Sequence, residues 1–599
     1  MLRLAFALVL AAAVLAAPVP AGAKTTQLLP GTTYESDVQF TPHGPVAIHV
    51  VRGPRPVGLF RLRTVLSNEA VIGRETVSSM QRRLTSQATM VGINGDFYAS
   101  AKGRPSGIFM RDGVLVTAPN RNRSSAGITL DGLLDVRRVR MFGTWRGLGQ
   151  RRPLTALNEA PGANGISLLT TDWGPTTPRV QGALTMILSP WDRALPNADL
   201  TASVSDFRQN GSAPIAPGTA VLMARGTAAE KVLAEAPLGT TVTIRLILQP
   251  GWETVGDAIG GGPVLVRDGA PVFRANEAFT TYQLAPRHPR TGVGQLADGR
   301  IILVVVDGRQ SGYSVGMTTF EMAQTMARLG AVRAMQLDGG GSSTVAFDGA
   351  VLNRPSDGRE RPISDALMLS YSGVYAPPPE VSVYSPNGDG VAEEQALGYK
   401  LVRPSTVTVT MTAPDGSVAF QESGEREPGI YEVAFPPEPP APEPPPEGEP
   451  APDPPPEPVE PLPPAEGRWA LTVSATDDQS LASTTTRRFW VNSTLGFLKV
   501  QPRTLLVPPA GRPATIAWSQ TRAALVTVTV ETASGIAIHT VAKRRFEPGT
   551  ASVAWDGRLR SGLRVYGGLY RIRVSARNDV GSVSLDQQLR VRRVAGPKK

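Results

Sequence analysis

The sequence contains no cysteine and only four histidines among its 599 residues. Disulfide bonds, thiolate metal sites and cysteine nucleophiles are therefore excluded, and so few histidines argue against a zinc site built from several of them. The P-loop motif and the H-E-x-x-H motif of zinc peptidases are also absent. No motif in the sequence requires a metal or cofactor for chemistry.

Net charge is small over most of the chain and concentrated at one end. The formal net charge is +10, yet residues 497–599 hold 18 Lys and Arg against 5 Asp and Glu. The rest of the chain is therefore close to neutral. A basic module of this kind attracts anionic polymers, and we expect an anionic cell-envelope polymer as its partner. Nucleic acid is not expected, because no nucleic-acid motif is present.

Residues 1–23 have the pattern of a cleavable signal peptide. Arg3 gives a basic start, residues 4–16 are apolar, and Ala21-Gly-Ala23 is an A-x-A cleavage site. A run of about 13 apolar residues is too short to span a bilayer, and no later run is long enough. We therefore expect a secreted or cell-envelope protein that begins near Lys24. An exported chain without cysteine suggests a bacterial source.

Composition divides the mature chain into three parts. Residues 24–375 mix short strands, Gly turns and few helices, which predicts one mixed α/β region. A Pro-rich boundary at 376–380 precedes segments of alternating apolar and polar residues, which are typical of β structure. Two β domains are expected, 376–496 and 497–599, because segments recur between them at offsets of 119 and 101 residues.

The repeat is clearest in two pairs of segments. Residues 407–411 match 526–530, and residues 469–475 match 570–576. The first copy is longer because of an insert, 436–466, which holds 17 prolines and many acids. Such a segment cannot form a core, and we expect an extended, disordered polyproline II loop. The two copies resemble the Ig-like sandwich of flagellar hook-capping proteins, which implies spacing or attachment rather than catalysis.

The first repeat opens with a turn rich in oxygen side chains. In Ser385-Pro-Asn387-Gly-Asp389-Gly390, Asn387 and Asp389 stand at alternate positions. This spacing resembles part of a calcium loop, so a structural calcium ion is one interpretation. The alternative is a Pro-Asn-Gly turn between domains, which is the more common use of such a sequence.

Three segments of the large domain end an apolar run with an aspartate in a Gly-rich turn: Asn94-Gly-Asp96, Val306-Asp307-Gly-Arg309 and Leu337-Asp338-Gly-Gly-Gly-Ser342. A fourth segment has three consecutive glycines at 260–262, and a fifth clusters cations at 287–290. An Asp-Gly pair alone is the usual turn of a hairpin. Only the combination of these segments in one domain points to a site.

The stretch between Asp307 and Asp338 predicts a β-α-β unit. Residues 301–306 form a continuous apolar strand, a Thr-x-x-Glu capping box at Thr318 starts a helix, and residues 333–337 form a second strand. A right-handed crossover makes the two strands parallel. Both aspartates should then lie at the same edge of the sheet, where open α/β sheets bind their ligands.

Acids and cations at one edge predict chemistry on a sugar phosphate. Two carboxylates can cleave a glycosidic bond, one as the acid and the other as nucleophile or base. Consecutive glycines let the backbone approach a ligand, and Arg290 and Arg309 suit phosphate oxygens. The three aspartates could instead bind a divalent cation, and each motif by itself could be only a tight turn.

The same motifs, in this order between about residues 45 and 372, resemble the phosphodiester glycosidase family. The resemblance implies an α+β domain with mixed sheets over 24–375, which hydrolyses a sugar-1-phosphodiester such as that of N-acetylglucosamine at its glycosidic bond. It implies Asp96, Asp307 and Asp338 as acids, without separating acid from nucleophile. It implies as substrate-binding residues Asn94, Gly261, Gly262, Arg290, Thr291, Arg309, Gly339, Gly340 and Ser342. His288 lies inside one motif and fits either a substrate contact or a structural role.

Three functions remain open at this point. The first is an exported hydrolase that acts on phosphodiester-linked sugars in a cell-envelope or extracellular polysaccharide. The second is a glycan-binding or adhesion protein without turnover, which the tandem β repeat and the basic end would suit. The third is a metal-dependent phosphodiesterase that cuts the P–O bond instead of the glycosidic bond.

Overall fold

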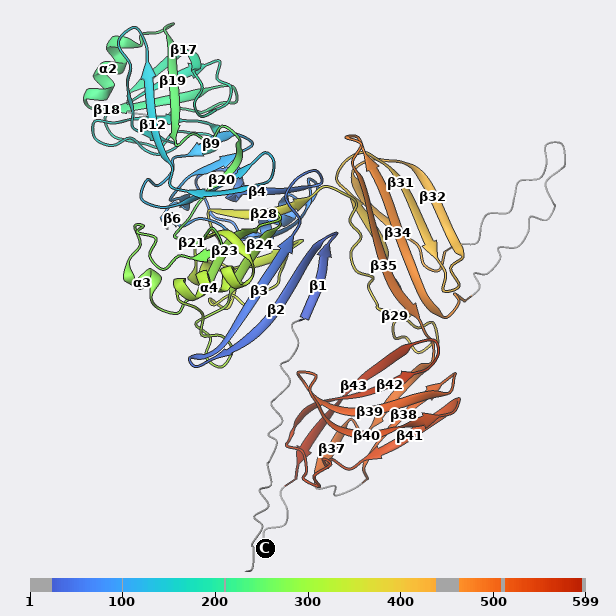
Figure 1. The fold of residues 1–599 in the computed structure, drawn as a ribbon. Helices are drawn as coiled ribbons and strands as arrows, with labels where there is room; N and C mark the ends of the chain where they lie inside the picture. The colour runs from blue at the N-terminus through green and yellow to red at the C-terminus, as the bar shows by residue number, and fades with distance from the viewer. Residues whose placement is uncertain (1–23, 100, 210–211, 438–462, 508–511, 595–599) are drawn as a thin grey trace, which may run out of the picture. The chain divides into compact units, whose positions relative to one another are not determined.

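The computed structural model describes residues 24–99, 101–209, 212–437, 463–507 and 512–594. The expected signal peptide (1–23) and most of the expected Pro-rich insert lie outside these residues. The chain divides into two compact units, Met1–Tyr371 and Ser372–Lys599, and each is described by itself (Figure 1). Among the described residues, no helix is long and apolar enough to cross a membrane.

The first unit is organised around an eight-stranded antiparallel sheet, called here the central sheet. In spatial order its strands are β1 (Lys24–Leu29), β2 (Thr32–Thr41), β3 (Gly44–Gly53), β24 (Ile301–Val306), β23 (Arg290–Leu296), β25 (Ala331–Gln336), β21 (Val264–Arg267) and β22 (Ala270–Pro271). Every residue of β23 and β24 is buried. A strand buried on both faces needs apolar side chains throughout, which explains the unbroken run at 301–306.

The predicted β-α-β unit is present in this sheet. Helix α4 (Thr319–Arg328) joins β24 to β25, and the capping box between Thr318 and Glu321 is formed as expected. Strand β23 lies between β24 and β25 and runs antiparallel to both, so β24 and β25 are parallel next-neighbours. The two strands therefore end at the same edge. Helix α4 packs on one face through Met322, Ala323 and Met326 (Figure 1).

A second sheet covers the other face of the central sheet. Its strands are β27 (Ala350–Val351), β26 (Val345–Phe347), β5 (Thr89–Asn94), β28 (Asp365–Tyr371) and β4 (Phe60–Leu66). The two sheets meet closely, because Leu369 of β28 fills the space that a side chain at Gly53 of β3 would need. Strand β5 ends at Asn94 and β28 begins at Asp365, so the two segments bring polar residues to one edge of the layered core.

Two further sheets complete the first unit. The third sheet contains β11 (Leu134–Arg137), β10 (Ser125–Thr129), β20 (Val255–Gly260), β8 (Phe109–Arg111) and β9 (Val114–Thr117). The fourth contains β13 (Arg152–Leu154), β12 (Arg140–Arg146), β19 (Thr241–Gln249), β17 (Leu200–Gln209), β16 (Ala183–Ser189), β18 (Ala220–Arg225), β15 (Ile166–Leu169) and β14 (Ala156–Leu157). The parallel pair β14–β15 makes this sheet mixed, as expected for the fold class.

The remaining elements of the first unit are short. A two-stranded ribbon joins β6 (Tyr98–Ala99) and β7 (Arg104–Pro105). The helices are η1 (Ser67–Glu69), α1 (Val77–Arg83), η2 (Thr171–Trp173), α2 (Thr227–Glu235), α3 (Thr281–Leu284) and η3 (Gly340–Ser342). The described part of this unit is thus an α+β fold dominated by strands, in agreement with the sequence.

The second unit contains two β-sandwiches. The first joins β29 (Val383–Tyr384), β35 (Ala482–Val491), β34 (Gly467–Asp477), β31 (Ser405–Thr412) and β32 (Val418–Arg426) to the pair β30 (Leu397–Leu401) and β33 (Gly429–Val433). The second joins β37 (Thr504–Val507), β43 (Ser582–Arg593), β42 (Gly568–Arg577), β39 (Ala524–Thr532) and β40 (Ala537–Phe546) to β36 (Leu495–Gln501), β38 (Ala514–Gln520) and β41 (Gly549–Trp555). Each sandwich has its own apolar core.

The internal repeat read from the sequence is confirmed by the pairing of the strands. Val407 of β31 lies opposite Ala475 of β34, and Val526 of β39 lies opposite Ala576 of β42. These are the positions that the two offsets relate. The five-stranded sheets also share their strand order, and in each the first strand is parallel to its neighbour.

Candidate active site

Three acidic segments meet where the central and second sheets end together. The N–H of Asp96 donates to Oδ1 of Asp365 at 2.7 Å, and the N–H of Asp338 donates to the carbonyl of Gly95 at 2.9 Å. The turn after β5, the turn after β25 and the start of β28 are thereby joined by hydrogen bonds. Two of the acids implied by the family resemblance, Asp96 and Asp338, are thus brought together, and a third aspartate, Asp365, joins them.

Asp96 is buried and fully hydrogen-bonded to the backbone. Its carboxylate accepts from the N–H groups of Phe97 at 2.7 Å and Gly107 at 2.6 Å. Burial raises the pKa of Asp96 to about 7, and the two N–H donors only partly oppose this rise. A side chain at Gly260 would collide with the carboxylate, 2.3 Å from Oδ2. The first glycine of the 260–262 run therefore makes room for Asp96.

Asp365 is the acid that the sequence did not reveal. It is fully buried, and no protein group donates to its Oδ2 among the described residues. Burial, and then the charge of Asp96, raise the pKa of Asp365 well above its usual range. It precedes a strand without a glycine-rich turn, so nothing in the local sequence marks it. Burial and the neighbouring Asp96 therefore favour the protonated form of Asp365.

Asp338 differs from the other two acids because it is partly exposed. Its Oδ1 accepts from the N–H of Gly339 at 2.8 Å. Burial raises the pKa of Asp338 to about 6, while the Ser342 side chain and the N–H of Gly339 act in the opposite direction. At neutral pH it is mostly ionised. It is therefore the carboxylate of the cluster that a ligand can reach.

Asn94 and Thr291 fix the relative positions of the acidic segments. The Asn94 amide donates to the carbonyl of Asp338 at 2.7 Å and accepts from the hydroxyl of Thr291 at 2.8 Å. It also accepts from the N–H of Thr344 at 3.1 Å. Both side chains are fully buried. The structure thus places these two expected substrate-binding residues beneath the site, where they hold the turn that contains Asp338.

The glycines of the site serve close packing. A side chain at Gly261 would meet the carbonyl of Gln336 at 2.7 Å, and Gly262 has a φ of +99° that favours glycine. Its N–H donates to the same carbonyl at 2.8 Å. The N–H of Gly340 donates to the carbonyl of Pro289 at 2.9 Å. These two N–H groups are therefore used within the protein.

Cations lie against the triple-glycine turn that follows Asp338. A side chain at Gly340 would lie 3.2 Å from the Arg309 guanidinium, and one at Gly341 would collide with Arg361. Arg361 is held by Asp357, to which its Nε donates at 2.8 Å. Arg309 was expected here, whereas Arg361 was missed because it comes from a loop without a motif.

A third cation, Arg123, was also missed by the sequence. Its guanidinium lies 4.9 Å from the ring centre of Phe97 and 4.5 Å from that of Phe279, a cation–π arrangement with two rings. Its charge acts on Asp96 and Asp338 and lowers the pKa of both. The acids therefore stand beside cations from three separate loops.

Arg290 does not offer its guanidinium to this site. The guanidinium is buried and donates to the carbonyls of Met317, Gln283, Leu284 and Pro286, at 2.7 to 3.3 Å. Burial lowers the pKa of Arg290 to about 10. With its donors used by the backbone, Arg290 ties α3 to the loop before α4. The sequence could not distinguish this use from phosphate binding.

Asp307 is likewise enclosed by donors. Its carboxylate accepts from Tyr313 at 3.0 Å, the Asn353 amide at 2.8 Å and the Arg354 N–H at 3.0 Å, and His49 Nε2 lies 2.9 Å away. Asp307 is only 1% exposed. The Asn353 amide also donates to the carbonyl of Ser343 at 3.1 Å. Through Asn353, Asp307 therefore stabilises the turn that follows Asp338.

His288 contacts one of the site's cations. Its Nδ1 lies 3.3 Å from Nε and 3.2 Å from Nη2 of Arg309. Burial, and then the charges of Arg309 and Arg290, lower the pKa of His288. A neutral imidazole that accepts at Nδ1 can orient Arg309, which has a φ of +59°.

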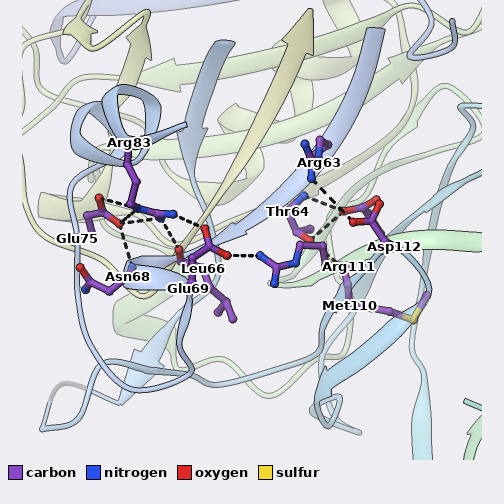
Figure 2. A network of polar contacts seen from close by, with 11 residues as sticks. Arg63, Thr64, Leu66, Asn68, Glu69, Glu75, Arg83, Met110, Arg111 and Asp112 are labelled. Atoms are coloured by element: carbon purple, nitrogen blue, oxygen red, sulfur yellow. Dashed lines mark hydrogen bonds and ion pairs between the residues drawn. The ribbon is translucent and has the colours of Figure 1, made fainter. Parts of the chain in front are cut away.

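An ion-pair network fixes the segment that precedes Asp365. Figure 2 shows Glu69 between Arg83 and Arg111, with Glu75 also held by Arg83 at 2.9 Å. Glu75 forms a backbone bridge with Ile363, two residues before Asp365. Burial acts to raise the pKa of Glu69, but hydrogen bonds from Arg111 and Arg83 outweigh it and lower that pKa.

Metal ligands are not gathered in this region. Over the described residues there is no group of three or more His, Asp and Glu arranged to hold a metal ion. At the calcium loop considered above, Asn387 Oδ1 accepts from the N–H of Asp389 at 3.1 Å. Asp389 in turn accepts from the N–H groups of Val391 and Phe497. These oxygens thus form the turn that was the alternative to a calcium site.

Comparison with known proteins assigns families to two regions. Residues 197–370 match the phosphodiester glycosidase family. Residues 197–370 are therefore similar to a phosphodiester glycosidase domain. The matched region contains Asp307, Asp338 and Asp365, whereas Asp96 and Arg123 precede it. Residues 510–579 match the FlgD Ig-like domain, which confirms the resemblance of the second repeat to hook-capping proteins.

Curated relatives of this domain match over short segments. The SPbeta prophage-derived uncharacterized protein YomE of Bacillus subtilis is 41% identical over 107 residues, 18% of this chain and 16% of that protein. The N-acetylglucosamine-1-phosphodiester alpha-N-acetylglucosaminidase of Bos taurus is 38% identical over 68 residues, 11% of this chain and 12% of that enzyme. The chain thus spans less than a fifth of the length of either relative.

A solved structure shares the fold. The crystal structure of a hypothetical protein from Synechocystis aligns with a TM-score of 0.51 at 22% identity, over 59% of this chain and 64% of that one. This likeness concerns the fold and does not identify a substrate.

Proposed function

We propose that this protein is an exported hydrolase that cleaves the glycosidic bond of a sugar-1-phosphodiester in cell-envelope or extracellular polysaccharide. The observation that carries the proposal is the cluster of Asp96, Asp338 and Asp365 beside Arg123, Arg309 and Arg361. The phosphodiester glycosidase match supports the same reaction. A sugar related to N-acetylglucosamine is the first substrate to test, because a relative is named for that activity.

In this proposal the cations receive the phosphate. Cleavage between C1 of the sugar and its oxygen releases a phosphomonoester, whose second pKa is about 6. Such a leaving group needs charge stabilisation more than protonation at neutral pH. Arg309 and Arg361, on either side of the triple-glycine turn, and Arg123 can supply it through charge-assisted hydrogen bonds.

Asp338 is then the carboxylate that acts at the anomeric carbon. It is the reachable acid of the cluster, and a pKa of about 6 leaves it ionised at neutral pH. It can attack C1 or remove a proton from the attacking water. Asp96 and Asp365 lie behind it, and the raised pKa of Asp365 favours a protonated form, which would limit the negative charge of the cluster.

The test is to follow products from a synthetic methyl diester of N-acetylglucosamine-1-phosphate with the protein from residue 24 onward. The proposal predicts free N-acetylglucosamine and methyl phosphate by mass spectrometry, and no turnover by Asp338→Asn. Release of the sugar phosphate and methanol would identify a phosphodiesterase instead. Retained binding of envelope glycans with no cleavage of this or any other sugar-1-phosphodiester would favour the adhesion function.

A further inference from the structure

The outer faces of the two repeats carry different kinds of side chain, although their sheets pair in the same register. In the first repeat the outer positions of β31, β34 and β35 are dominated by hydroxyl side chains. Cross-strand hydroxyl pairs such as Thr472–Thr486 and Ser474–Thr484 lie 3.2 Å and 3.0 Å apart. In the second repeat the equivalent face is dominated by cations.

Register defines the members of this cationic face. Residues directly opposite each other on neighbouring strands share a face. The outer positions of β40, β42 and β43 that are cationic are Lys543, Arg545, Arg571, Arg573, Arg577, Arg590 and Arg592. The side chains that alternate with them along β42 and β43, such as Ile572 and Leu589, are buried in the core of the sandwich.

Among the described residues, three carboxylates pair with these cations, and one of them, Glu547, lies 3.7 Å from Nε of Arg545. Glu531 accepts from Nε of Arg571 at 2.8 Å, and Asp586 accepts from Nε of Arg573 at 2.8 Å. These two arginines are thereby held flat on the sheet. Lys543, Arg577 and the cations of β43 are exposed around them. Seven cations against three acids leave a positive surface in the described part of this repeat.

The first repeat shows that the fold itself does not require these charges. The 101-residue offset relates Ala470 to Arg571, Thr472 to Arg573 and Thr476 to Arg577. The same sandwich is therefore built with neutral side chains at these three places. Six of the seven cations are arginine, whose planar guanidinium matches a phosphate oxygen pair.

We propose that the cationic face binds a linear polymer with repeating phosphodiester groups, which it holds as the substrate source for the first unit. Along a strand, outer positions repeat every two residues, about 6.6 Å apart, and neighbouring strands lie about 4.8 Å apart. A flexible polyanion can therefore meet several cations at once as it crosses the sheet. The choice of phosphodiester over carboxylate groups rests on the proposed function, whereas the attraction to polyanions rests on the face alone.

The test uses the full chain and a synthetic poly(glycerol phosphate), which has no glycosidic bond to cleave. Lys543→Gln, Arg545→Gln and Arg577→Gln are combined in one variant, because none of these cations pairs with Glu531 or Asp586. The control combines Lys499→Gln, Arg512→Gln and Arg560→Gln, which removes three exposed charges of the same repeat from other surfaces. Both variants are checked for folding by their melting temperature.

Binding is measured at several salt concentrations, and log K is plotted against the log of the salt concentration. Each lost contact should reduce the steepness of this plot by about 0.7, so the slope of the face variant should be shallower by about 2. Its affinity should fall at least tenfold, while the control should stay within twofold to threefold. An equal loss in both variants would overturn the assignment to this face. Equal affinity of the wild-type chain for polygalacturonate would overturn the phosphodiester chemistry. If the chain bound the polymer but did not cleave sugar diesters, the assignment of binding to the cationic face would stand and the proposed function would be contradicted.

Discussion

Asp307 and Asp338 occupy equivalent places in the two strands that α4 connects. Each follows a buried strand, each is followed by glycine, and both lie at the same edge of the central sheet. Yet Asp307 is surrounded by four donors and Asp338 is partly exposed with a raised pKa. The difference arises from remote segments, since His49 and Asn353 bind the Asp307 carboxylate, whereas the Asp338 carboxylate accepts only from the N–H of Gly339 among the described residues.

The largest effect is expected from Asp338→Asn. Removal of the reachable carboxylate should lower kcat/KM about 10³-fold, because the amide can neither attack C1 nor accept a proton from water. The melting temperature should change little, since only one N–H donor is bound to this side chain in the described structure. Steady-state kinetics on the methyl diester, beside a thermal melt, measures both. Near-normal activity would remove Asp338 from the chemistry.

Asp307→Asn should mainly lower the stability of the fold, in contrast to Asp338→Asn. The amide cannot accept from all the donors around it, so buried donors lose their partner and unfolding should become easier by about 3 kcal/mol. Denaturant titration of the full chain, followed by tryptophan fluorescence, measures this. Asp298→Asn, in an exposed Asp-Gly turn, is the matched control and should cost less than about 0.5 kcal/mol. If the Asp307→Asn variant were stable but inactive, Asp307 would have the same catalytic role that is proposed for Asp338, which would contradict the contrast between them.

Arg361→Gln tests whether the turn after Asp338 receives a phosphate. Loss of this cation should lower kcat/KM about tenfold to a hundredfold, with a smaller effect on a substrate whose leaving group is a neutral phenol. Arg359→Gln removes a neighbouring exposed charge and serves as the control. Equal losses on charged and neutral leaving groups would contradict a phosphate contact at Arg361.

The last prediction concerns the dependence of stability on pH through Asp365. A buried acid with a raised pKa stays protonated in the folded chain after it has ionised in the unfolded chain. Stability then falls as pH rises above the unfolded pKa, by about 1.4 kcal/mol per pH unit for each such group. Asp365→Asn cannot ionise, so its unfolding free energy should fall less between pH 4 and pH 7 than that of the wild type. Parallel pH profiles would show that Asp365 ionises normally.

Local sequence was sufficient for features that depend on neighbours along the chain. The capping box at Thr318 and the strand at 301–306 were predicted and are confirmed. The segments that recur in the sequence also pair in matched registers in the two repeats. These depend on periodicity and on turn chemistry over a few residues. Asp96 and Asp338 were also expected at one site, and they are joined there by hydrogen bonds through Gly95 and Asp365.

Features created by the meeting of separate sheets could not be predicted. Asp365, Arg123 and Arg361 lie in ordinary sequence, and they reach the site only because three loops converge. A residue that was wrongly expected at the site has the same explanation, which is contact with distant segments. Arg290 lies in a motif typical of phosphate binding, yet carbonyls from α3 and the loop before α4 use its donors. Side-chain partners from distant segments decide these functions.

The most direct test of the proposed reaction is hydrolysis of the methyl diester in water enriched in ¹⁸O. Attack at the anomeric carbon, assisted by Asp338 and with phosphate held by the cations, places the label in the released sugar. Cleavage of the P–O bond places it in the phosphate. Mass spectrometry of both products should find the label in N-acetylglucosamine and none in methyl phosphate. Label in the phosphate would contradict glycosidic cleavage and the role given to Asp338.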